Sequence, residues 1–152
     1  MLLVSVDGAS GPGADREWTC SVPAEQGHGR TLRADVREWL LSLGSDAGRI
    51  DDVLLVLSEL FSNAVRATVG QANVSVTVTV TPQAGSLDEV TVAVANVGKA
   101  FELSSLKPPA PDREGGRGLA IASSLGSVRV LRNSKRTVVE CALDGPGPDP
   151  RR

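Results

Sequence analysis

The sequence predicts an α+β fold, a two-layer α/β sandwich in which helices cover one face of a mostly antiparallel sheet. After one short strand come two segments with apolar residues at helical spacing, and then two pairs of segments with alternating apolar residues. Adjacent alternating segments favour antiparallel pairing with one buried face. The expected helices are about 30–43 and 50–69, and the expected strands are 16–22, 73–81, 89–97, 127–132 and 136–143.

Length and composition indicate one ordinary globular domain. The chain has 152 residues, of which 41% are hydrophobic and 22% charged, and its net charge is −2. No apolar run is long enough to span a bilayer, and the N-terminus lacks the basic start of a signal peptide. We therefore expect a cytoplasmic domain at 16–143, flanked by flexible segments at 1–15 and 144–152, with no direct binding to nucleic acid or membrane.

The first strand and helix contain few residues that could take part in catalysis or metal binding. The strand 16–22, REWTCSV, should end at Pro23, and the first helix should stop at Gly44. Cys20 and Cys141 are too few for a zinc site or a disulfide framework, so two buried reduced thiols are expected. The single histidine, His28, has no nucleophile pattern near it and is expected in a loop or at a helix start. Apolar residues of the first helix recur at Leu32, Val36, Trp39, Leu40 and Leu43.

The second helix combines an apolar body with a polar stripe. It should begin near Ile50 and run to about Val69, with Gly70 closing it. Residues 53–57, VLLVL, are apolar around more than a full turn, so the helix is expected to be largely buried. Four polar residues nevertheless share one stripe at spacings of 7, 4 and 3: Asp52, Glu59, Asn63 and Arg66.

Strand parity places a polar residue on the helix-facing side of the sheet. In the strand 73–81 four valines alternate with Ser and Thr, and in 89–97 three valines alternate with Thr and Ala. Asn96 keeps the parity of the second set, so it points toward the helices at the C-terminal end of its strand. The two sets are Val74, Val76, Val78 and Val80, and Val90, Val92 and Val94.

A long loop and a glycine cluster follow that strand. Residues 99–114 have the length of a functional lid. The segment GGRGLAIASSLG then opens a short helix at 118–125. Glycines at a helix start let backbone N–H groups approach an anion closely, which indicates a phosphate site.

The stretch LSELFSNAVRA resembles the N-box of the Bergerat-fold ATPase superfamily, which includes histidine kinases, gyrase and heat-shock chaperones. Together with the chain before it and the later GGRGLAI, it is similar to the anti-sigma-factor serine kinases. The resemblance covers about 16–143 and implies the Bergerat fold, a histidine kinase-like ATPase fold. In that family the N-box acid is the general base, here Glu59. The N-box amide binds the Mg²⁺ that bridges ATP phosphates, here Asn63.

The resemblance also implies an ATP site around these two residues. Gly116 and Gly118 would bind phosphates through their N–H groups, and Thr137 would hydrogen-bond near the adenine. The remaining implied nucleotide-binding residues are Asn96, Gly98, Gly115, Arg117 and Leu119.

The chain departs from the family pattern in the adenine box, which is an Asp, any residue and a Gly at the end of a strand. Asn96 stands where the Asp is expected, followed by Gly98, and Ala100 stands where the box usually has a second glycine. The lid is rich in proline, and Ala67 replaces a histidine that often follows the N-box Arg. An Asn carbonyl can accept the bond from the adenine amino group, and its amide can donate to a ring nitrogen. A neutral bond in place of a charge-assisted one costs roughly 1 kcal/mol, or about tenfold in affinity.

The resemblance and the departures from it imply two functions from different classes. The first is an ATP-dependent kinase that phosphorylates a serine of an anti-anti-sigma protein, sequesters a sigma factor, or does both. The resemblance implies that such a protein can form a homodimer. The second is a non-catalytic protein-binding regulator with a degenerate nucleotide pocket. A detached histidine kinase domain fits less well, because the chain has no phosphoacceptor helix. Simpler alternatives also remain: a solvated stripe pairing Glu59 and Asn63 with Arg66, a strand-end cap at Asn96, and a plain turn at 115–118.

Overall fold

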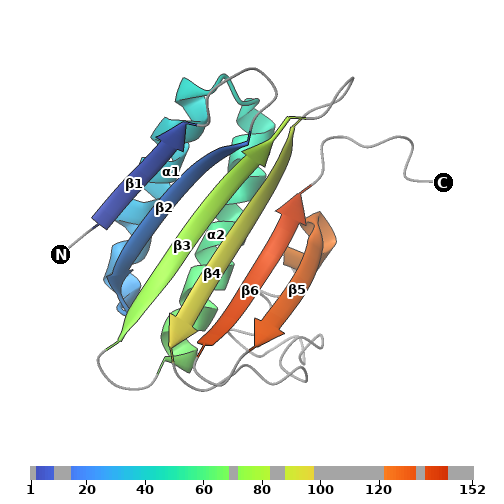
Figure 1. Ribbon diagram of the computed structural model, residues 1–152. Coiled ribbons are helices and arrows are strands. Elements are labelled where there is room, and N and C mark those ends of the chain that lie inside the picture. The colour runs from blue at the N-terminus through green and yellow to red at the C-terminus, as the bar shows by residue number, and fades with distance from the viewer. Residues whose placement is uncertain are drawn as a thin grey trace.

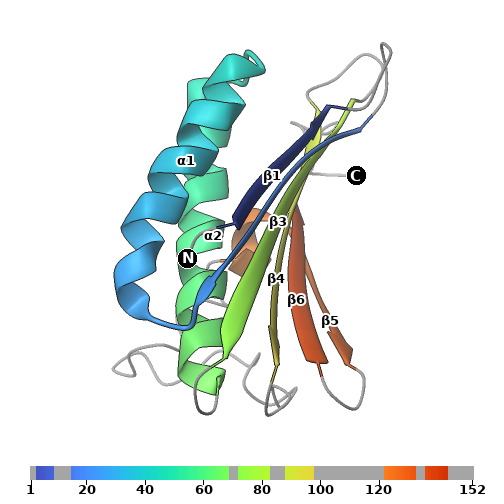
Figure 2. The same ribbon diagram turned by 60° about the vertical axis from the view of Figure 1, so that its left-hand side comes forward.

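The computed structural model describes residues 3–8, 15–68, 72–82, 88–97, 122–132 and 136–143, with the backbone alone at 3–8, 97 and 132. Six strands form one sheet in the order β1-β2-β3-β4-β6-β5, and every neighbouring pair is antiparallel. Both long helices lie against one face of this sheet (Figures 1 and 2), which confirms the predicted two-layer α+β fold. The elements are β1 (Leu3–Gly8), β2 (Arg16–Pro23), η1 (Gln26–His28), α1 (Gly29–Ser42), α2 (Ala47–Ala67), β3 (Asn73–Thr81), β4 (Glu89–Val97), β5 (Ser127–Arg132) and β6 (Arg136–Leu143).

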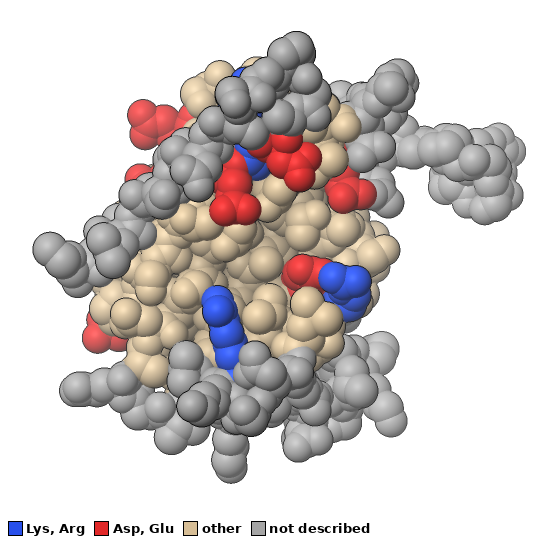
Figure 3. Space-filling model, in the orientation of Figure 1, with Lys and Arg blue, Asp and Glu red and all other residues tan. Residues whose placement is uncertain are grey.

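The alternating pattern predicts the central strands correctly. The bounds of β3, β4, β5 and β6 are those expected from the sequence. The valines of β3 and β4 that share one parity are buried under the helices, because side chains at alternate positions point to the same face. The other face carries half-buried Ser and Thr residues, among them Thr77 and Thr91. Figure 3 shows this open face, whose centre is mostly uncharged, with acidic side chains gathered toward its upper end.

The strand β1 corrects the prediction of a flexible segment at 1–15. Leu3–Gly8 pairs with β2 in a continuous antiparallel register, from Leu3 opposite Ser21 to Gly8 opposite Arg16. Without this pairing β2 would present a row of unpaired N–H and C=O groups at the edge of the sheet. Residues 1–2, 9–14 and 144–152, also expected to be flexible, lie outside the described residues.

The helix bounds follow from their caps. Gly44 has a positive φ of 79° just after α1, as expected for a residue that ends a helix. The helix α2 begins three residues earlier than predicted because Asp46 caps it: the Asp46 carboxylate accepts a hydrogen bond from the Arg49 N–H at 3.3 Å. At the other end Thr68 has extended backbone and its hydroxyl donates to the Ala64 carbonyl at 2.6 Å.

The core fills the space between the helices and the sheet. Its largest fully buried side chains include Trp18 from β2 and Phe61 from α2, with leucines and valines from both layers around them. Cys20 and Cys141 are buried and free, as expected. In the described part of the chain, no helix has the length and apolarity needed to cross a membrane.

Candidate functional site

Three buried polar side chains gather at one end of the sandwich. Asn63 lies near the C-terminus of α2, Asn96 near the end of β4, and Thr137 at the start of β6. Among the described residues these are the polar side chains of the buried interior, with exposed fractions of 7%, 1% and 1%. In Figure 1 these parts of α2, β4 and β6 meet at the lower end of the sheet. All three residues belong to the site predicted from the sequence.

The sheet register brings Asn96 and Thr137 together. The two residues are directly opposite each other in the antiparallel pair of β4 and β6, two residues beyond the pair Val94 and Val139. Because parity alternates, Asn96 and Thr137 face the helices on the same side as these valines. The core is therefore apolar along these strands and becomes polar only at this end.

The amide of Asn96 uses its donor and leaves its acceptor unused. Its Nδ2 donates to the hydroxyl oxygen of Thr68 at 3.4 Å. Its Oδ1 is buried and has no hydrogen-bond partner among the described residues. The residue departs from the family's Asp, yet it presents a free carbonyl oxygen within the site.

Asn63 and Thr137 also contain unsatisfied polar atoms. The Asn63 Oδ1 accepts a hydrogen bond from Nη2 of Arg66, whereas its Nδ2 has no partner in the part of the chain that the structure describes. The same holds for the hydroxyl of Thr137. A buried polar group without a hydrogen bond costs about 1–3 kcal/mol, so each such group in a native protein calls for an explanation. Three of them at one end of the fold are explained if a polar ligand binds there.

Glu59 lies one helical turn before Asn63 on α2 and is half-buried. The alternative that Glu59 merely pairs with Arg66 in a solvated stripe does not hold, because Glu59 has no ion pair or hydrogen bond to a described residue. The guanidinium of Arg66 binds Asn63 instead. A carboxylate without a described partner, one helical turn from the buried Asn63, can serve as a proton acceptor.

The predicted phosphate-binding part lies outside the described residues. This applies to Gly98, to the lid 99–114, and to the residues Gly115, Gly116, Arg117, Gly118 and Leu119. Residues 122–125 are helical, which agrees with the last turn of the helix expected at 118–125. The roles assigned to the glycine cluster therefore stay predictions.

The residues present are compatible with Mg²⁺ held mainly by a nucleotide. Within the described ranges no three His, Cys, Asp or Glu residues form a metal cluster. Magnesium commonly takes one or two protein oxygens and completes its shell with phosphates and waters. The carbonyl oxygen of Asn63 is a suitable ligand, although Arg66 now donates to that oxygen.

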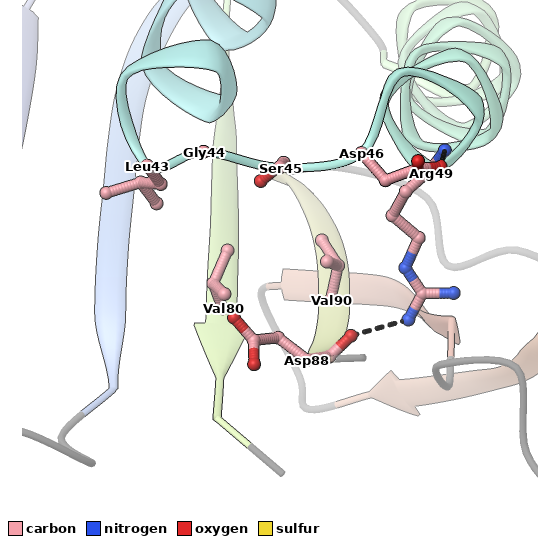
Figure 4. Close-up of a pocket in the computed structure, with 8 residues that line it drawn as sticks. All are labelled: Leu43, Gly44, Ser45, Asp46, Arg49, Val80, Asp88 and Val90. Atoms are coloured by element: carbon pink, nitrogen blue, oxygen red, sulfur yellow. Dashed lines mark hydrogen bonds between the residues drawn. The ribbon is translucent and has the colours of Figure 1, made fainter. Parts of the chain in front are cut away.

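A small pocket lies at the opposite end of the sheet (Figure 4). Its volume is about 130 Å³, less than the several hundred Å³ typical of ligand pockets. Nη2 of Arg49 donates to the carbonyl of Asp88 at 2.7 Å and to the carbonyl of Leu143. Arg49 thus ties the start of α2 to the start of β4 and the end of β6, which favours a structural role for this pocket. Its lining residues are Leu43, Gly44, Ser45, Asp46, Arg49, Val80, Asp88 and Val90.

Comparisons with known proteins agree with this fold. A family described as "Histidine kinase-like ATPase domain" matches residues 22–142. No curated protein matches the chain. The solved structure of the RsbU and RsbW domains of Rv1364c from Mycobacterium tuberculosis is similar to it, with a TM-score of 0.56 and 22% identity. That similarity covers 82% of this chain and 32% of the other, so this chain spans about a third of its neighbour's length. Because the family match extends over most of the sequence, the chain belongs to the histidine kinase-like ATPase family.

Proposed function

We propose that the protein binds ATP at the polar end of the sandwich and transfers its γ-phosphoryl group to a serine of a partner protein. One observation carries the proposal. Asn63, Asn96 and Thr137, from three different elements, bring unsatisfied buried polar atoms together at one end of a histidine kinase-like ATPase domain. A nucleotide would supply the missing hydrogen-bond partners.

The adenine would lie against β4 and β6. The buried Oδ1 of Asn96 can accept a hydrogen bond from the exocyclic amino group of adenine. The hydroxyl of Thr137, directly opposite in the register, can donate to a ring nitrogen. Both contacts would be made in a site with little access to water, where a hydrogen bond discriminates strongly between matched and mismatched groups.

The phosphates would lie toward α2. Asn63 would hold Mg²⁺ through its carbonyl oxygen, and the ion would neutralise charge on the phosphates. Arg66 must then share or release this oxygen, since a guanidinium and a metal cation repel each other. The predicted contacts of Gly116 and Gly118 would complete phosphate binding.

Glu59 would act as the general base for phosphoryl transfer. As the serine oxygen bonds to the γ-phosphorus, the bond from that phosphorus to the leaving ADP oxygen breaks, and Glu59 accepts the serine proton. The carboxylate is half-buried and has no ion pair among the described residues, so nothing described competes for this role.

The resemblance to anti-sigma-factor serine kinases supplies the partner class. The phosphorylated serine would belong to an anti-anti-sigma protein, and the same domain would sequester a sigma factor in the cytoplasm, acting as a homodimer. Within this scheme ATP hydrolysis is not required, because the acceptor is a protein hydroxyl.

A second candidate function is a non-catalytic regulator of the same fold. Two observations favour it: a neutral Asn96 replaces the expected carboxylate, and Arg66 engages the oxygen assigned to Mg²⁺. Both features would weaken nucleotide binding, and neither would change the surfaces that could bind a partner protein.

Calorimetric titration with ATP and Mg²⁺ tests the binding proposal. Asn96→Leu removes the acceptor and should weaken binding by tenfold or more, because a buried donor of the ligand is left unpaired. Thr91→Val, on the open face of β4, is the control and should bind as the wild type does. No heat of binding at millimolar ATP would overturn the proposal and leave the non-catalytic function.

A phosphotransfer assay with [γ-³²P]ATP and a purified anti-anti-sigma protein tests the catalytic role. Glu59→Gln should abolish transfer while ATP binding stays within about twofold, since the amide keeps the size of the side chain but cannot take the proton. Loss of ATP binding in this variant would show that Glu59 contacts the nucleotide instead.

A further inference from the structure

We propose that Thr68 sets the direction of the Asn96 amide, and that this direction makes the site selective for a purine with an amino group at C6. The inference rests on the proposed nucleotide binding and adds a specificity-determining residue to it. Thr68 itself would not touch the base. It would act as a positioning residue through Asn96.

The hydroxyl of Thr68 can only accept a hydrogen bond from Asn96. A hydroxyl has one proton, and that proton is used in the 2.6 Å bond to the Ala64 carbonyl. The Asn96 atom at 3.4 Å must therefore be the donor Nδ2. If the amide were reversed, two oxygen acceptors would face each other and Nδ2 would lose this partner.

The position of Thr68 keeps this acceptor in place. Thr68 follows the last residue of α2, and its backbone N–H also donates to the Val65 carbonyl, at 3.2 Å. Two bonds to the final turn of α2 thus anchor the residue. Asn96 is only 1% exposed, so a reversed amide would leave a buried donor without this protein partner, which is costly.

The consequence is a site that presents a hydrogen-bond acceptor. With Nδ2 held by Thr68, Oδ1 is the Asn96 atom left for a ligand. Adenine offers an amino donor at C6, whereas guanine and hypoxanthine carry a carbonyl acceptor there. A carboxylate has two acceptor oxygens and needs no such help. An amide presents either a donor or an acceptor, and Thr68 decides which of them faces the base.

Titrations with ATP and ITP test the selection, because the two bases differ only at C6 and in the protonation of N1. The wild type should bind ATP at least tenfold more tightly than ITP. Thr68→Val keeps the branched shape but lets the amide reverse, so the ITP-to-ATP ratio of dissociation constants should fall about fivefold to tenfold. Thr68→Ser keeps the hydroxyl and should retain the wild-type ratio. An unchanged ratio in Thr68→Val would overturn the inference.

The free protein provides an independent readout. The side-chain ¹⁵N–¹H₂ signals of Asn96 can be assigned by their loss in Asn96→Asp. Thr68→Val should shift these signals, and Thr68→Ser should leave them near their wild-type positions. Unchanged signals in Thr68→Val would refute the orientation whether or not nucleotide binds, whereas absent ATP binding with shifted signals would overturn the proposed function and the selectivity that rests on it.

Discussion

Replacing Thr137 with Val should make the protein more stable and weaken its binding of ATP. The Thr137 hydroxyl is buried, and it has no hydrogen-bond partner among the described residues. Valine has nearly the same shape and no polar atom to desolvate. An unpaired buried hydroxyl costs about 1–3 kcal/mol, so Thr137→Val should raise the free energy of unfolding by about 1 kcal/mol or more. For a chain of this size, 1 kcal/mol corresponds to a rise of roughly 2–4 °C in Tm.

The same substitution should weaken ATP binding, because the hydroxyl would no longer donate to the base. The loss of one neutral hydrogen bond corresponds to roughly fivefold to tenfold in affinity. Urea unfolding of the free protein and calorimetric titration with ATP measure the two effects. Thr91→Val is the matched control: it makes the same change on the half-buried open face of β4, so its unfolding free energy should stay within about 0.5 kcal/mol of the wild type.

The two results must have opposite signs for the reasoning to hold. If Thr137→Val lowers the unfolding free energy by 1 kcal/mol or more, the hydroxyl has a stabilising partner and is not reserved for a ligand. If the variant is more stable but binds ATP as tightly as the wild type, Thr137 is unsatisfied for a reason unrelated to the nucleotide.

Three further predictions concern other residues. Asn96→Asp should tighten ATP binding about tenfold, because a charge-assisted bond is roughly twice as strong as a neutral one; weaker binding by calorimetry would contradict this. Arg66→Met should increase the ratio of ATP dissociation constants measured in EDTA and in Mg²⁺ by about fivefold, since the guanidinium no longer competes for the Asn63 oxygen; an unchanged ratio counts against Asn63 as a metal ligand. Burial raises the pKa of the Cys141 thiol from 9.0 to about 11, so between these pH values the unfolded chain loses this proton while the folded chain keeps it. The stability due to Cys141 is therefore present below pH 9 and lost as pH rises toward 11. Cys141→Ala should show a shallower decline in urea unfolding over that range, and parallel curves would disprove the shift.

Local patterns predicted most of the fold, and pairing partners decided the rest. The alternation of Val with Ser and Thr in 73–81 is a signal contained within nine residues, so the bounds of β3 follow from it. The strand β1 has only six residues and is stabilised by its pairing with β2, in which the partners lie from 8 positions apart (Gly8 and Arg16) to 18 positions apart (Leu3 and Ser21). Such pairing is a tertiary contact that the short segment does not reveal by itself.

In the site, too, local sequence patterns predicted the positions of residues, whereas contacts between distant residues were harder to predict. Helical spacing placed Glu59 and Asn63 on one face, and strand parity placed Asn96 toward the helices, as the structure confirms for the buried amides. The hydrogen bond between Asn96 and Thr68 was not predicted, whereas the pairing of Asn63 with Arg66 was part of the alternative of a solvated stripe. A threonine next to the end of a buried helix is a visible signal, but its bond to Asn96 joins residues 28 positions apart.

The central question for this site is whether an amide can replace the family's carboxylate. An amide has half the acceptor capacity and can present the wrong group, so its chemistry depends on its neighbours. In this protein the neighbour is Thr68, whose only proton is committed to Ala64. That commitment directs the Asn96 donor away and leaves the carbonyl for the ligand. Compared with an Asp, Asn96 would therefore offer adenine a weaker hydrogen bond, but one in the same direction. This geometry favours weakened adenine binding over the complete loss of it.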